Sequence, residues 1–157
     1  MPRFRRAFIE GGSYFFTVVT FNRMPILTTE ESRAILRAAW LDVNGRFPFE
    51  TVAVCLLPEH LHRIGSLPEG DAEHSMRWKE IKRLFTKSYL VKVGPGEERN
   101  ESRLKTGEAA IWQRRYWEHM IRDEEDLWRH LDTIHYNPVK HGLAQRVADW
   151  PWSSFHR

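Results

Sequence analysis

The chain has 157 residues, with 24 Lys or Arg against 21 Asp or Glu, so its formal charge is +3 and its pI is about 9.2. The length fits one domain with a sizeable core, whereas the small excess of positive charge does not by itself establish a polyanionic partner. The single cysteine, Cys55, excludes an internal disulfide, and no stretch has the apolar length of a membrane span or a signal peptide. We therefore expect one intracellular, soluble domain over residues 1–157.

The first half of the chain is predicted to contain three strands and one helix. Residues 13–21 are rich in β-branched and aromatic side chains and predict a strand. A capping-box pattern, Thr28-x-x-Glu31, opens a helix over 28–43, and the continuous apolar run 49–57 suits a strand covered on both faces. After a turn at 58–59, the alternating residues 60–67 predict a returning strand, because a preceding proline disfavours helix.

The second half begins with an amphipathic helix over residues 73–92. Its apolar stripe lies opposite four basic residues, Lys79, Lys82, Arg83 and Lys87. A solvated basic face is one interpretation of these four residues, and a phosphate-contacting helix is the other.

A flexible loop at about 93–108 is predicted next, since this segment is rich in Gly, Pro and charge. Residues 111–121 end in a predicted strand, and residues 123–137 form a helix that Pro138 should stop. Leu127, Leu131 and Ile134 form the buried stripe of this helix, and Asp126, His130, Thr133 and Asn137 share a polar face. The order predicts an α+β fold, a ferredoxin-like split β-α-β antiparallel sheet with helices on one face plus a C-terminal helix.

His60 and His62 are the candidate metal ligands. On a helix, two residues apart means roughly 200° apart, so the imidazoles would face away from each other. On a strand both rings lie on one face, with Leu61 on the other. Two imidazoles do not hold a divalent ion well, so a third ligand must come from elsewhere. The alternative is an ordinary pair of half-buried, hydrogen-bonded histidines.

Several segments together carry a resemblance to a known family: LPEHLH, SLPEGD, RWKEIKRLFT, IWQRRYWEH, IHYNPVKHGL and DWPWSSFHR. They are similar, in order and over essentially the whole chain, to the REP-associated tyrosine transposases within the single-tyrosine HUH transposases of bacteria. The resemblance implies Mg²⁺ or Mn²⁺ bound by His60, His62 and Asn137. It also implies that a helical tyrosine attacks a phosphate of single-stranded DNA, leaving a 5′-phosphotyrosine and a free 3′-OH.

The resemblance further implies a partner and a location. The partner would be hairpin DNA from repetitive extragenic palindromes with a short 5′ single-stranded guide, and the protein would be a monomer or homodimer in the bacterial cytoplasm, associated with the nucleoid. The DNA surface would combine the basic helix with Arg5 and Arg6 and with the aromatic and basic residues Trp112, Arg114, Arg115 and Trp117. Guanidinium groups and aromatic rings stack well on unpaired bases.

One position departs from the family pattern Tyr-x-x-x-Asn. Four residues before Asn137 stands Thr133, whose hydroxyl lacks the reach of a phenol and has a pKa far above the roughly 10 of tyrosine. Tyr136 is a weak alternative nucleophile, since it is displaced roughly 60° from Thr133 and 100° from Asn137 on a helical wheel. Natural loss of cleavage, an introduced substitution and use of another tyrosine all remain open.

Two other functions compete with DNA strand transfer. The first is a non-catalytic nucleic-acid-binding module, derived from such a transposase, in which the histidines are structural. The second is a metal-dependent hydrolase using bound water, which ranks last because Glu59 is the one carboxylate near the histidines and is expected to be exposed in the turn.

Overall fold

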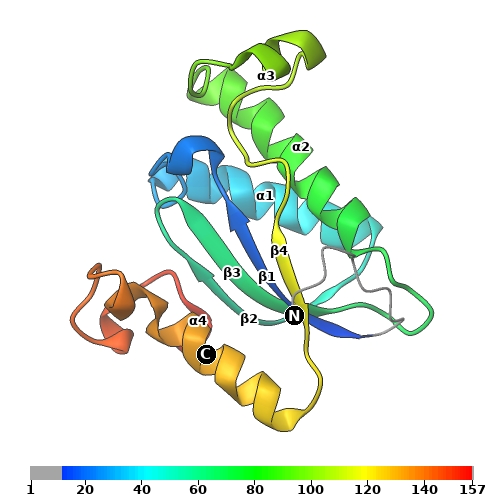
Figure 1. Ribbon diagram of the computed structural model, residues 1–157, viewed down its shortest axis with the longest axis vertical. Coiled ribbons are helices and arrows are strands. Elements are labelled where there is room, and N and C mark those ends of the chain that lie inside the picture. The colour runs from blue at the N-terminus through cyan, green and yellow to red at the C-terminus, as the bar shows by residue number, and fades with distance from the viewer. Residues whose placement is uncertain (1–11, 157) are drawn as a thin grey trace.

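Figure 1 shows the computed structural model, which describes residues 12–156. Three short 3₁₀ turns accompany the main elements, at Phe21–Arg23, Val147–Asp149 and Ser154–His156. In chain order the strands and α-helices are β1 Ser13–Val19, α1 Glu30–Arg46, β2 Glu50–Leu56, β3 His60–Ser66, α2 His74–Lys92, α3 Glu101–Thr106, β4 Trp117–Met120 and α4 Glu124–Lys140.

The four strands form one sheet in the order β2-β3-β1-β4, and every neighbouring pair is antiparallel. This is the order of a ferredoxin-like split β-α-β unit, so the predicted fold class is confirmed. β1 and β3 occupy the centre, and their register pairs Val19 with His60 and Thr17 with His62. The histidine strand is therefore held on both edges, which restricts the direction of its side chains.

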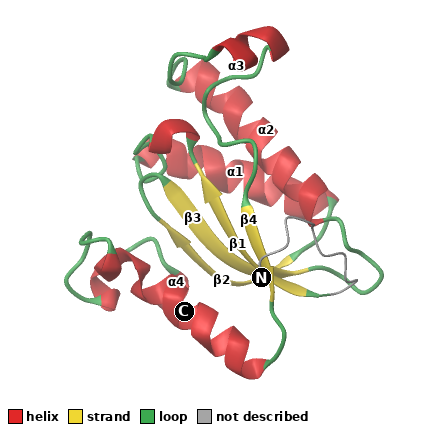
Figure 2. Cartoon of the chain, in the orientation of Figure 1, coloured by secondary structure: helices red, strands yellow, loops and turns green. Residues whose placement is uncertain are grey.

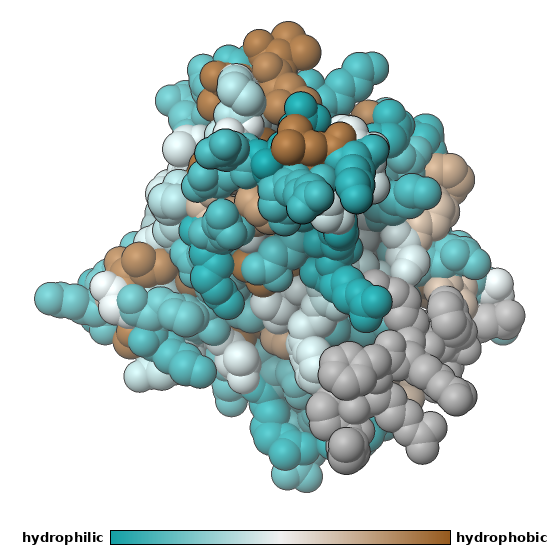
Figure 3. Space-filling model, turned by 45° about the horizontal axis from the view of Figure 1, so that its top comes forward, coloured by the Kyte–Doolittle hydropathy of each residue, from teal (hydrophilic) through white to brown (hydrophobic). Residues whose placement is uncertain are grey.

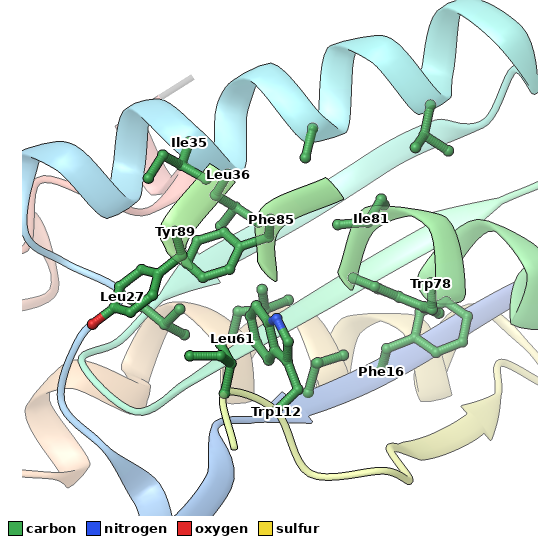
Figure 4. Packing of buried hydrophobic residues seen from close by; sticks show 14 of the residues in the cluster. Phe16, Leu27, Ile35, Leu36, Leu61, Trp78, Ile81, Phe85, Tyr89 and Trp112 are labelled. Carbon is green, nitrogen blue, oxygen red and sulfur yellow. The ribbon is translucent and has the colours of Figure 1, made fainter. Parts of the chain in front are cut away.

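Helices cover the two faces of the sheet separately (Figure 2). α1 and α2 pack on the face that carries Phe16 and Leu61, and Figure 4 shows Trp78, Ile81 and Phe85 of α2 turned into this core. α4 covers the opposite face, where Phe15 and Ile64 meet Ile134 and Cys55 is fully buried. Successive side chains of β1 and β3 point to opposite faces, so each strand contributes to both hydrophobic clusters.

The boundaries differ from the prediction in two helices. Thr29, rather than Thr28, caps α1, because its side chain accepts a hydrogen bond from the backbone N–H of Ser32. Pro138 lies inside α4, which continues to Lys140. A proline lacks the N–H that would bond the carbonyl of Ile134, yet α4 continues for two residues beyond Pro138, which is itself buried.

Two further expectations need correction. β2 is an edge strand, and its Val52 is 42% exposed, so the strand is not covered along its whole length. The segment 93–108 is not loop throughout, because Asn100 caps the short helix α3 and Gly107, at φ 78°, ends it. Arg103 of α3 is buried and donates hydrogen bonds to the carbonyls of Ala109 and Trp112, which fastens the segment to the domain.

The surface in Figure 3 is mainly hydrophilic, with hydrophobic residues gathered at its upper end, where the C-terminal part of α2 and α3 lie. Leu90, Val91, Val93 and Leu104 are exposed in these two elements and the residue after α2. Within residues 12–156, none of the helices is long and apolar enough to cross a membrane.

Candidate active site

His60 and His62 lie on the same face of β3, as strand geometry predicts. Their ring centroids are 4.8 Å apart, and both residues are buried, at 4% and 7% exposure. Each ring is held through Nδ1: Glu59 Oε1 accepts a hydrogen bond from His60 Nδ1 at 2.8 Å, and His62 Nδ1 lies 2.9 Å from Thr17 Oγ1. Nε2 of each ring is therefore the nitrogen left for a ligand role.

Asn137 approaches this pair from the other side of the site. It lies in the last turn of α4, is 5% exposed, and places its Oδ1 3.3 Å from His60 Nε2. Because Nδ1–H of a neutral His60 is donated to Glu59, Nε2 carries a lone pair that faces an amide oxygen. Two acceptors turned toward one another suit a shared cation, whose neighbouring ligands in an octahedral Mg²⁺ shell are roughly 3 Å apart.

Burial keeps both imidazoles uncharged. Desolvation lowers the pKa of His62 to about 3, and repulsion from His60 and His141 adds to this shift. Desolvation also lowers the pKa of His60, although the hydrogen bond from His60 to Glu59 opposes it. Neutral imidazole is the form that binds metal, so the donor set fits a divalent ion at neutral pH.

Glu59 and His141 complete the surroundings of the pair and were not assigned these roles from the sequence. Glu59 is partly buried, with 24% of its side chain exposed, and orients His60 instead of standing free in the turn. The His141 ring lies 5.3 Å from the His60 ring, and its backbone N–H donates to the carbonyl of Asn137. The spacing of four residues between Asn137 and His141 was a signal for this proximity.

Thr133 lies one turn before Asn137 on α4 and is exposed. Its hydroxyl donates a hydrogen bond to the carbonyl of Arg129 at 3.0 Å, within its own helix. Tyr136 is 55% exposed while its neighbour Asn137 is buried, so the phenol leaves the helix in another direction.

A basic groove of about 750 Å³ lies beside α2, on the face of the sheet opposite His60. Its lining includes the four basic residues predicted on this helix, together with Arg114 and Tyr116. Lys79 and Lys87 are exposed, whereas Lys82 Nζ donates to the carbonyl of Gln113 and Arg83 pairs with Glu80. The groove and His60 lie near the same end of the sheet, because Val19 pairs with His60 and accepts a hydrogen bond from the N–H of Gln113.

The remaining candidates for the DNA surface differ in how exposed they are. Trp112 is 6% exposed and packs against Phe85, so most of its ring lies in the core, although the residue also lines the basic groove. Trp117 is 49% exposed and Arg115 is exposed, while Arg114 pairs with Glu108 at 3.1 Å. Arg5 and Arg6 lie outside the described residues.

Comparison with known proteins gives close relatives, although no family model matches the chain. A Haemophilus influenzae protein named putative REP-associated tyrosine transposase is 46% identical over 159 residues, covering all of this chain and 87% of the relative. The REP-associated tyrosine transposase of Escherichia coli K12 is 44% identical over 157 residues, covering all of this chain and 84% of the relative.

Solved structures agree with these relatives. The structure of a REP-associated tyrosine transposase bound to a REP hairpin matches with a TM-score of 0.81 and 43% identity, over all of this chain and 84% of that chain. A putative transposase from Deinococcus radiodurans R1 matches with a TM-score of 0.54 and 15% identity, over 87% of this chain and 97% of that chain, and supports the fold alone. With relatives 44% and 46% identical over its whole length, the chain belongs to the REP-associated tyrosine transposases, a family of DNA-cleaving enzymes.

Proposed function

We propose that this chain binds hairpin and single-stranded DNA of repetitive extragenic palindromes and presents a phosphate of that DNA to His60, His62 and Asn137. The observation that carries the proposal is the convergence of two β3 imidazoles and an α4 amide oxygen at one point, with His60 Nε2 and Asn137 Oδ1 3.3 Å apart. A Mg²⁺ or Mn²⁺ ion held by these three residues would polarise the scissile phosphate. Glu59 and Thr17 serve as positioning residues that fix the two rings.

The residue at the expected position of the nucleophile is poorly suited to attack a phosphate. In a tyrosine transposase, a phenol oxygen bonds to phosphorus, the phosphorus–O3′ bond breaks, and the leaving 3′ oxygen takes up a proton. Thr133 occupies the corresponding position one turn from Asn137, but its short side chain is hydrogen-bonded back to Arg129. We therefore infer that the chain retains DNA and metal binding and forms a covalent adduct poorly.

The basic groove supplies the DNA path. Lys79 and Lys87 line the groove and would contact phosphates, and Arg115 and Trp117, which are exposed at the start of β4, would extend this path. Because the groove and His60 lie on opposite faces at one end of the sheet, bound DNA would pass around that end of the sheet to reach both. The stacking role proposed for exposed aromatic residues rests here on Trp117 instead of Trp112.

The test is incubation of the chain with a hairpin-bearing single strand from a repetitive extragenic palindrome, with Mn²⁺ or with EDTA. We expect Mn²⁺-dependent binding with little covalent adduct on a denaturing gel. Abundant adduct that persists in Tyr136→Phe would contradict the inferred loss of cleavage. Binding that is indifferent to both EDTA and His60→Ala would instead favour the second candidate, a non-catalytic nucleic-acid-binding module.

A further inference from the structure

Three side chains from β4 and α4 form a second polar cluster: His119, Asp126 and His130. One potential ligand atom from each lies within 4.8 Å of the others. His119 Nε2 donates to Asp126 Oδ2 at 2.8 Å, and His130 Nδ1 lies 3.2 Å from Asp126 Oδ1. The His119 and His130 rings are stacked, with centroids 4.6 Å apart.

This cluster is separate from the candidate active site although both lie on the same face of the sheet. The ring of Phe15 stands between them, with its centroid 5.3 Å from that of His62 and 4.8 Å from that of His130. A metal ion in one cluster therefore shares no ligand with the other.

The sheet register and the helical period bring the cluster together. His119 pairs with Phe15 across β4 and β1, which directs both side chains toward α4. Asp126 and His130 are four residues apart in α4 and thus lie on one side of the helix. The carboxylate side chain is 2% exposed and the imidazoles 28% and 22%, so the cluster is ordered by packing yet open to solvent.

Two imidazoles and a carboxylate are a donor set that zinc and related ions take in proteins. His130 Nδ1 also lies 2.8 Å from the backbone carbonyl of Asp126, so binding of a metal through Nδ1 would replace this hydrogen bond, whereas binding through Nε2 would keep it. Ligand atoms around a tetrahedral Zn²⁺ are roughly 3.3 Å apart, given metal–ligand distances near 2 Å. The donor atoms of the cluster lie within 4.8 Å of one another, so rotation of the side chains, including the two stacked rings, would bring them to this spacing.

We propose that His119, Asp126 and His130 bind a divalent transition-metal ion of the Zn²⁺ class, with a fourth position open to solvent. The ion replaces the proton between His119 and Asp126 and ties β4 to the first turns of α4. α4 also carries Thr133 and Asn137, so the ion would stabilise the position of the helix that contributes these two residues to the candidate active site. The inference does not require His60 and His62 to bind metal.

Two arginines flank the cluster and oppose a cation. Arg122 Nε lies 3.7 Å from Asp126 Oδ2, and an Arg129 nitrogen lies 4.0 Å from Oδ1. Both arginine side chains are more than 60% exposed and can turn toward solvent. Removing one positive charge, as in Arg122→Gln, should therefore tighten metal binding.

The test is a Co²⁺ titration of the full chain carrying His60→Gln and His62→Gln, which removes the ligands of the other site. Tetrahedral Co²⁺ absorbs visible light strongly. Cys55 should not compete as a ligand, because burial raises the pKa of its thiol to about 12 and keeps it protonated at neutral pH. We expect one Co²⁺ per chain, displaced by Zn²⁺. Adding His130→Ala, or separately His119→Gln, should weaken binding beyond the roughly 10–100-fold effect of an outer-shell residue. The matched control is His135→Ala, a change on α4 at a histidine that bonds Ser154.

Each outcome decides a different point. No Co²⁺ binding by the doubly substituted chain, with its fold intact by circular dichroism, would overturn the second metal site. Equal binding with and without His130→Ala and His119→Gln would do the same. Identical stoichiometry in the wild type and the doubly substituted chain would instead count against metal at His60 and His62, leaving the second site supported.

Discussion

His60 Nε2 lies 3.3 Å from Asn137 Oδ1, although 77 positions separate the two residues in the chain. The contact joins the central strand β3 to the last turn of α4 and defines the candidate metal site. Asn137→Ala removes the oxygen without adding bulk, so we expect Mn²⁺ affinity to fall by at least about 10-fold, the lower end for residues supporting a metal site. Isothermal titration measures the change. Asn137→Asp keeps an oxygen at this point and should retain binding; equal affinities for Ala and Asn would remove Asn137 from the ligand set.

Thr133→Tyr should create covalent chemistry. A phenol at this position has the reach and the acidity that a threonine hydroxyl lacks, and Thr133 lies exposed one turn from Asn137. We expect a Mn²⁺-dependent protein–DNA adduct with a hairpin-bearing strand, visible as a shifted band on a denaturing gel. Thr133→Phe supplies the ring without the hydroxyl and serves as the matched control. If Thr133→Tyr gives no more adduct than Thr133→Phe, the assignment of the nucleophile position is wrong.

Lys79→Gln and Lys87→Gln should each weaken DNA binding and also make its affinity less dependent on salt concentration. Both lysines are exposed and line the basic groove. Each lost phosphate contact reduces the slope of log K against log[salt] by about 0.7 for single-stranded DNA. Fluorescence anisotropy at several salt concentrations measures this slope. Lys92→Gln, at an exposed position on the same helix outside the groove lining, is the control and should leave the slope unchanged. A slope unaltered in all three variants would assign the basic face of α2 to solvent.

Acidification should destabilise the fold in part through His74. Burial, with repulsion from Arg63 and Arg77, lowers the pKa of His74 to about 4, while Asp71 opposes this shift. Between the ordinary value of 6.5 and about 4, the unfolded chain binds a proton at this position that the folded chain does not. The free energy of unfolding therefore falls as pH falls through this interval.

His74→Gln should reduce that dependence, since glutamine does not titrate. Melting temperatures of the variant and the wild type across this pH interval measure the difference. His156→Gln, at an exposed position, is the control. If the pH dependence of the wild type is unchanged in His74→Gln, the prediction is wrong and the dependence must be assigned to His60 and His62, whose pKa values burial also lowers.

Local patterns in the sequence were sufficient for the elements of the site. Alternation over residues 60–67 placed both histidines on one face, because side chains of a strand repeat every two residues. The helical period placed Thr133 one turn before Asn137 and Ile134 in the buried stripe. These statements depend on backbone geometry within a single element, which composition and spacing encode directly.

Contacts between elements were decided by the tertiary structure. The approach of Asn137 to His60, the hydrogen bond from His60 to Glu59, and the burial of Trp112 against Phe85 depend on how helices and loops pack on the sheet. The meeting of His119 with Asp126 and His130 likewise requires the β1–β4 register and the position of α4. Periodicity indicates which face a side chain occupies, but the distance to a residue on another element follows only when both elements share one packed core.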